Sequence, residues 1–254
     1  MPTDPPKTQL HGIRVLVTGA TSGLGAAMAA ALTQAGARVM VTGRDESRAQ
    51  AMADELGPPA VGWRLDVRDE RSVAACVAGA LEAWGGIDVL VNNAGIGMRT
   101  VNPRFMSEPQ PFWEVTPAGF RDVVETKVVG CFLMARAVVP PMLADGGGRI
   151  VNISMNEQTM VRRGFVPYGP SGAGVEALSR VMEADLAGTS VTVNILLPGG
   201  ATLTGMIPDG ASAETRASLL DPAVMGPPIV WLASESAAGV HGRRIVATEF
   251  DPDG

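Results

Sequence analysis

Short runs of apolar residues recur along the chain, and each run is followed by glycine or by polar residues. Residues within a run are apolar in succession rather than in alternation, as in strands that are buried on both faces of a sheet. This pattern predicts about seven strands, at residues 13–17, 38–41, 61–65, 87–91, 149–153, 191–196 and 244–248.

Between these runs, apolar residues recur at helical spacing. After the first run, Leu24, Met28 and Leu32 lie on one side of a predicted helix, and Gly36 ends it. Similar patterns predict helices at residues 24–35, 70–84, 117–143, 167–186 and 222–233.

Strands and helices therefore alternate along the chain, which favours parallel strands joined by crossover helices. A length of 254 residues suits one α/β domain. We predict a tail at residues 1–10 and, over residues 11–254, a single Rossmann-like domain. Its doubly wound parallel sheet carries helices on both faces.

The amino-acid composition restricts the partners and sites that are expected. The net charge is −6 and no run of Lys or Arg stands out, so nucleic acid is not an expected partner. Cys76 and Cys131 are far apart, and His11 and His241 are the only histidines, so no metal site and no disulfide are expected.

The first nine residues are polar and proline-rich, unlike a signal peptide. The longest apolar stretch, at residues 128–143, contains Arg136, Pro140 and Pro141, which we interpret as interruptions. We therefore expect no membrane span, no membrane partner and a cytoplasmic protein.

Two segments are too long for ordinary loops, at residues 96–115 and 199–220. Both follow predicted strands at the carboxyl edge of the sheet, where open α/β folds bind ligands. Long irregular segments at such an edge usually form pocket walls or lids.

A glycine-rich turn, TGATSGLG, joins the first strand to the first helix at residues 18–25. Glycine permits a tight turn and lets a pyrophosphate approach the backbone N–H groups at the helix N-terminus. Its strand–turn–helix setting supports a dinucleotide site, and the absence of a Gly-Lys-Ser/Thr sequence disfavours a P-loop nucleotidase.

Four motifs occur in order along the chain: the turn TGxxxGxG, Asp66-Val67, the sequence NNAG at residues 92–95, and Pro198-Gly199. Together they resemble the short-chain dehydrogenase/reductase family. The resemblance implies an NAD(P) cofactor, a small-molecule substrate and assembly as a homotetramer or homodimer. It assigns cofactor binding to Gly19, Thr21, Ser22, Gly23, Leu24, Gly25, Asp66, Val67, Asn93, Ala94, Gly95, Tyr168, Pro198, Gly199, Thr202 and Thr204.

The choice between NADP and NAD is predicted from the residues after the second strand. Arg44 stands there, and a guanidinium suits a 2′-phosphate, whereas an acidic residue suits a 2′-hydroxyl. NADP(H) is therefore favoured, with NAD(H) as the alternative.

In this family, a set of Asn, Ser, Tyr and Lys carries the chemistry. By resemblance, Tyr168 keeps the position of the tyrosine that exchanges the substrate proton. The serine, lysine and asparagine positions fall on Met155, Gly172 and Lys127. Ser154 is one residue too early and should face the opposite side of its strand, which leaves Ser171 and Asn156 as weaker stand-ins.

Lys127 has two interpretations. Its ammonium group either reaches the volume left free at Gly172 and replaces the missing lysine, or lies in solvent for unrelated reasons. The catalytic candidates are therefore Tyr168, Lys127, Met155 and Gly172, and the substrate pocket is expected at Met98, Met155, Asn156, Phe165 and Met206.

A tyrosine with a pKa of about 10 is almost fully protonated at neutral pH, so it suits an acid better than a base. We predict an oxidoreductase that favours reduction of a carbonyl or imine-type small molecule, with Tyr168 as proton donor. The alternatives are a catalytically silent NADP-binding sensor or partner subunit, and a non-redox lyase or isomerase on the same fold.

Overall fold

The computed structural model describes residues 9–252, which contain one parallel sheet of seven strands in the order β3-β2-β1-β4-β5-β6-β7. The strand positions predicted from the apolar runs are confirmed to within two residues. The strands are β1 (Arg14–Val17), β2 (Arg38–Gly43), β3 (Val61–Arg64), β4 (Val89–Asn92), β5 (Gly148–Ile153), β6 (Val191–Leu197) and β7 (Arg244–Val246).

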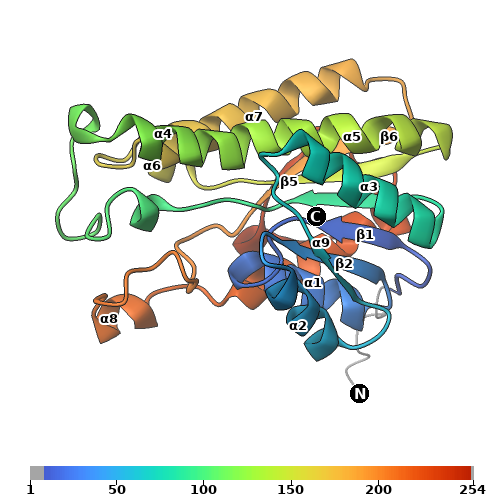
Figure 1. Cartoon of the computed structure of the whole chain (residues 1–254), viewed down its shortest axis with the longest axis horizontal. Coiled ribbons are helices and arrows are strands. Elements are labelled where there is room, and N and C mark those ends of the chain that lie inside the picture. The colour runs from blue at the N-terminus through green and yellow to red at the C-terminus, as the bar shows by residue number, and fades with distance from the viewer. Residues whose placement is uncertain (1–8, 253–254) are drawn as a thin grey trace.

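Helices cover both faces of the sheet (Figure 1). One layer contains α1 (Gly23–Gln34), α2 (Glu46–Leu56) and α9 (Gly226–Ala233). The other contains α3 (Glu70–Trp84), α4 (Pro117–Val124), α5 (Gly130–Ala144) and α7 (Tyr168–Asp185), and the short helices α6 (Glu157–Met160) and α8 (Ala213–Ala217) lie in loops. Each layer packs a separate apolar core against the sheet, so the predicted doubly wound α/β fold is confirmed.

The predicted strand–helix series lacked α2. Its inward face consists mainly of the small residues Ala49 and Ala53, which give little apolar signal. The chain nevertheless marks both ends, because Asp45 accepts a hydrogen bond from the Arg48 N–H and Gly57 follows the last turn.

The predicted helix at residues 117–143 forms as α4 and α5, joined by a π-helical turn at Glu125–Val129. The predicted helix included Pro140 and Pro141, and α5 continues through both to Ala144. Each proline fixes a helical φ, and packing of α5 against α3 and β5 holds the last turn together.

Length and composition alone would let the helix at Pro117–Ala144 cross a membrane, since its most apolar 18-residue window has a mean hydropathy of 1.5. Of that window, 44% is buried inside the fold, and buried helices of globular cores meet the same criterion.

Most of the predicted tail, residues 1–8, lies outside the described residues. Leu10 does not belong to a tail. Its side chain is only 1% exposed, and its N–H donates to the carbonyl of Ala35 at 2.7 Å. The packed chain therefore begins before residue 11.

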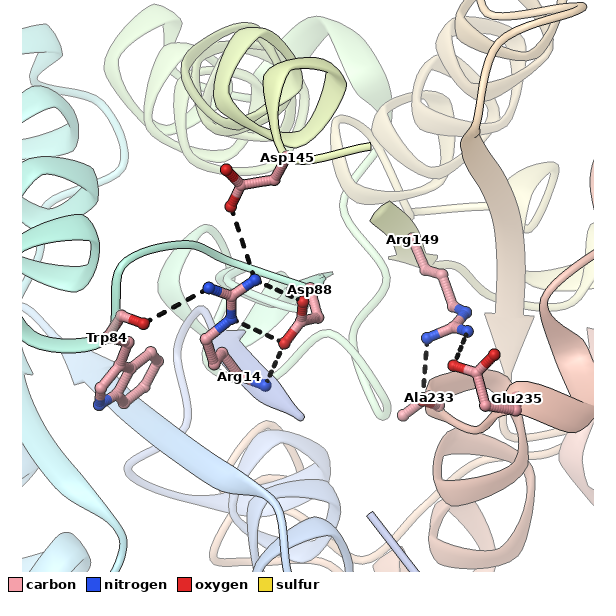
Figure 2. Close-up of polar contacts among 7 residues, drawn as sticks. All are labelled: Arg14, Trp84, Asp88, Asp145, Arg149, Ala233 and Glu235. Carbon is pink, nitrogen blue, oxygen red and sulfur yellow. Dashed lines mark hydrogen bonds and ion pairs between the residues drawn. The ribbon is translucent and has the colours of Figure 1, made fainter. Parts of the chain in front are cut away.

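Two ion pairs hold the amino edge of the sheet (Figure 2). Arg14 binds both carboxylate oxygens of Asp88 and also donates to the Trp84 carbonyl. At the start of β5, Arg149 donates to the Ala233 carbonyl and to Glu235. These contacts tie β1 to β4 and β5 to α9, which leaves the opposite, carboxyl edge free for a ligand site.

Candidate active site

The glycine-rich turn after β1 is held by the segment after β4. The Thr18 hydroxyl accepts hydrogen bonds from the N–H groups of Asn93 and Ala94, both at 2.9 Å. The Asn93 amide donates in turn to the carbonyls of Thr18 and Gly19. The strand order runs outward from β1 in one direction and from β4 in the other. The junction between β1 and β4 is therefore the topological switch point of the sheet.

The glycines of this turn allow close approach. Gly19 and Gly23 have φ values of 64° and 57°, in the left-handed region, and a Cβ at Gly25 would collide with Asn93. Ser22 makes no side-chain capping bond to α1, so the first N–H groups of α1 point to the turn. These features fit a dinucleotide pyrophosphate, as predicted for Thr21, Ser22, Gly23, Leu24 and Gly25.

Arg44 and Asp66 lie at the expected adenosine end. Arg44 is exposed after β2. Hydrogen bonds from Arg68 lower the pKa of the Asp66 carboxyl, and the nearby charge of Arg44 lowers it further. The sequence prediction missed Arg68, which binds both oxygens of Asp66. Val67 is buried and packs against Gly130.

The turn after β6 faces the glycine-rich turn. Gly199 has a φ of 96°, and its carbonyl accepts a hydrogen bond from the Asn156 amide at 2.9 Å. Thr202 is buried and bridges to Leu220, whereas Thr204 lies beside Gly23. The segment after β6 therefore lies beside the glycine-rich turn at Thr204, and Gly95 and Pro198 follow the ends of β4 and β6.

Tyr168 and Lys127 come together between α7 and the π-helical turn. The Nζ atom of Lys127 lies 5.5 Å from the centre of the Tyr168 ring, in a cation–π contact. The Lys127 side chain is 9% exposed. The interpretation of Lys127 as a lysine in solvent is therefore wrong. The π-helical turn directs it inward, and such turns are frequent at functional sites.

Burial changes the ionisation of both groups. It lowers the pKa of the Lys127 ammonium to about 8, an effect that the neighbouring Cys131 thiol partly offsets. It also raises the pKa of the Tyr168 phenol, because the charged form is less well solvated. At neutral pH, Lys127 is thus mainly a cation and Tyr168 mainly a neutral acid.

A small cavity extends from the Lys127 side chain toward the end of β4. Its wall combines polar and apolar groups from β1, β4, α5 and α7, and the lining residues are Thr18, Val67, Asn92, Ala94, Thr126, Lys127, Gly130, Cys131, Ile153 and Val175. Behind it, the Asn92 amide donates to the Asn152 side chain, which donates to Ser179. The sequence prediction did not identify this buried polar chain.

The neighbouring hydroxyl groups bind other partners. Ser154, directly after β5, donates to Glu176 on α7 at 2.6 Å. Ser171 donates to the Pro167 carbonyl one turn earlier in the helix. Met155, at the predicted serine position, is buried, and its thioether packs over Gly172.

An apolar cluster packs against Tyr168. Met98, Phe105 and Phe165 form a buried cluster that contacts Tyr168. The Tyr168 hydroxyl donates to the Met206 sulfur at 3.8 Å, a weak hydrogen bond. Of the predicted pocket residues, Met98, Phe165 and Met206 therefore contact one another or Tyr168, whereas Asn156 and Met155 point to Gly199 and Gly172.

Arg99 joins the two long segments, and the sequence prediction missed it. Its guanidinium donates to the carbonyls of Gly205 and Ile207 and pairs with Asp209. Met206, which contacts the Tyr168 hydroxyl, lies between these two anchored carbonyls. Arg99 thus holds the segment at residues 205–209 beside Tyr168.

We expect Arg99→Met to raise the KM for substrate by about threefold to tenfold, the worth of one or two lost hydrogen bonds. Limited proteolysis should become faster within residues 205–209. Arg104→Met is the matched control, because Arg104 pairs only within its own segment, with Glu108. Equal KM values in the two variants would contradict the role of Arg99.

The sheet order, the switch-point turn and the tyrosine beside it define a dinucleotide-dependent oxidoreductase fold. A family model described as short chain dehydrogenase matches residues 14–214. The chain is 33% identical over 243 residues to the 3-oxoacyl-(acyl-carrier-protein) reductase FabG of Vibrio cholerae, covering 93% of this chain and 96% of that protein.

Similarity extends to other enzymes. D-threitol dehydrogenase of Mycolicibacterium smegmatis is 32% identical over 256 residues, covering 94% of this chain and 92% of that protein. The solved structure of 3-ketoacyl-(acyl-carrier-protein) reductase from Brucella melitensis, complexed with NADH, has a TM-score of 0.82 at 29% identity and covers 94% and 97% of the two chains. The chain therefore belongs to the short-chain dehydrogenase/reductase family of NAD(P)-dependent oxidoreductases.

Proposed function

We propose that this protein is an NADPH-dependent reductase of apolar carbonyl or imine-type small molecules. Tyr168 delivers the proton to the substrate, and the Lys127 ammonium assists from the side of the π-helical turn. The observation that carries the proposal is the position of Lys127 Nζ, 5.5 Å over the Tyr168 ring.

A bound nicotinamide would supply the hydride, and the protein residues would do the rest. The first N–H groups of α1 would hold the pyrophosphate, and the turn at Gly199 would contact the nicotinamide. The cluster of Met98, Phe105 and Phe165 binds the apolar part of the substrate and excludes water.

The proton transfer follows from the charges. As Tyr168 loses its proton to the substrate oxygen or nitrogen, negative charge develops on the phenol oxygen. The cation at Lys127 stabilises this charge in a site of low polarity, where such an interaction is stronger than in water. Without it, the raised pKa of the Tyr168 phenol would make this group a poor acid.

The engaged hydroxyls of Ser154 and Ser171 bear on the substrate class. Both bind other residues, so neither is free to hydrogen-bond a developing oxyanion. A neutral imine accepts the Tyr168 proton on its nitrogen and develops no oxyanion, so it needs that donor less than a simple ketone does. Imines therefore rank first among the substrates we propose.

Arg44 supports the choice of NADPH. We expect Arg44→Glu to raise the KM for NADPH by roughly tenfold to a hundredfold, as expected for the loss of a charge-assisted contact. The KM for NADH should change less or fall. Arg38→Glu is the matched control, since Arg38 is exposed at the amino end of the same strand, away from the site. Equal effects on the two cofactors would contradict the assignment.

One assay separates the proposed reductase from its alternatives. The protein is mixed with NADPH and a panel of apolar ketones, aldehydes and cyclic imines, and NADPH oxidation is followed with Tyr168→Phe as the blank. Substrate-dependent oxidation supports the reductase. Tight NADPH binding without oxidation identifies a silent binding protein, and substrate turnover without NADPH consumption identifies a lyase or isomerase.

A further inference from the structure

A side chain at Gly172 would displace the Met155 side chain. A Cβ atom placed on it would lie 2.7 Å from Cε, 2.9 Å from Sδ and 3.1 Å from Cγ of Met155. Three successive atoms of the methionine thus cover the glycine. Gly172 and Met155 are both buried, so this contact lies inside the fold.

The surrounding contacts hold Met155 in this place. Arg244, on β7, donates to the Met155 carbonyl at 3.1 Å and to the carboxylate of Glu176 on α7. Ser154 donates to the same carboxylate. The backbone at residues 154–155 is therefore tied to both β7 and α7.

Gly174, two residues further along α7, provides the contrast. A Cβ there would lie 3.5 Å from Val128 Cγ2, which is an ordinary van der Waals contact. Glycine within a helix is unfavourable relative to residues with side chains. The contact with Met155 therefore distinguishes position 172 from position 174, where no such contact occurs.

We propose that Met155 is a positioning residue that fills the space in which a side chain from position 172 would run. It thereby leaves Lys127 as the cation beside Tyr168. The site then has two mutually exclusive packings: methionine at 155 with glycine at 172, or a small residue at 155 with a long one at 172. The functional part of this inference rests on the reductase proposed above.

The packing part is tested by a thermal double-mutant cycle of Met155→Ser and Gly172→Lys. Met155→Ser leaves a cavity and Gly172→Lys overpacks the same space, so each alone should lower Tm by about 5 °C or more. The double variant should recover most of both losses. Gly174→Lys, the matched control, should show no dependence on Met155→Ser.

Should Gly172→Lys fail to fold, Gly172→Ala gives the milder single substitution for the same cycle. Additive losses of Tm would overturn the proposal, as would Gly172→Lys with the Tm of the wild type. These readouts require no turnover, so they test the packing even if the chain proves not to be a reductase.

The functional part is tested in the background of Lys127→Asn. Adding Met155→Ser and Gly172→Lys places an amine beside Tyr168 again and should raise kcat/KM about tenfold or more above that of Lys127→Asn alone. The pH profile of kcat/KM should then differ from that of Lys127→Asn alone, with a new decline as the introduced lysine loses its proton. A triple variant no more active than Lys127→Asn would overturn the positioning role, while wild-type turnover reports on the reductase separately.

Discussion

Replacing Tyr168 with phenylalanine should lower kcat/KM for substrate-dependent NADPH oxidation by about 10²- to 10⁴-fold, the usual contribution of a positioned proton donor. Tyr168 is the only tyrosine in the chain, so no other phenol can take over its role. Tyr168 packs against the apolar cluster, and its hydroxyl donates to the Met206 sulfur. A substrate oxygen or nitrogen would accept the same proton after displacing that sulfur.

The phenylalanine variant should otherwise resemble the wild type. The ring keeps its contacts with the cluster of Met98, Phe105 and Phe165 and with the Lys127 ammonium. The Tm and the dissociation constant of NADPH should therefore change little, which shows that the lost activity is not lost structure. Turnover within a factor of a few of the wild type would rule out Tyr168 as the donor.

Lys127→Met should make the protein more stable and less active. A buried ammonium is costly, and the depression of its pKa from 10.5 to about 8 corresponds to about 3 kcal/mol against folding at neutral pH. Methionine keeps the aliphatic stem without the charge. Urea denaturation at pH 7 should therefore show a higher free energy of unfolding, reduced by the loss of the cation–π contact.

The stability gain should depend on pH in a defined direction. Between about pH 8 and 10.5, the unfolded chain binds the Lys127 proton more tightly than the folded protein does. The free energy of unfolding of the wild type therefore rises with pH between about pH 8 and 10.5, as the cost of burying the charge is relieved. Below about pH 8 the full cost applies. The advantage of Lys127→Met should shrink from pH 8 to pH 10, whereas a constant difference would contradict the burial of a cation.

Lys127→Met should lower the activity although it raises the stability. Loss of the cation removes the stabilisation of the developing tyrosinate and should lower kcat/KM by about 10²-fold, as for other single electrostatic groups in active sites. A functional residue that reduces stability is a common compromise in enzymes. Lys127→Arg, which keeps the charge, should retain more activity than Lys127→Met at every pH.

Much of the fold could be predicted because the strands are apolar throughout and glycine or polar residues mark their ends. The errors came from weaker signals. Ala49 and Ala53 made the buried face of α2 hard to recognise. The predicted tail extended to residue 10, although Leu10 is buried.

The cofactor end of the site was predictable because its motifs are short and local. The other end depends on contacts between distant segments. No local pattern indicated that Arg99 would hold residues 205–209, or that a π-helical turn would direct Lys127 toward Tyr168. The packing of Met155 over Gly172 likewise joins β5 to α7 and has no local signature.

The most direct test of the central claim is the pH dependence of kcat/KM for the wild type and for Lys127→Met between pH 6 and 9.5. If the Lys127 ammonium assists Tyr168, the wild-type value should fall as the pH rises through about 8. The methionine variant should then be less active at pH 7 and nearly independent of pH. A decline at the same pH in both proteins would show that another group titrates and that Lys127 does not act on the phenol.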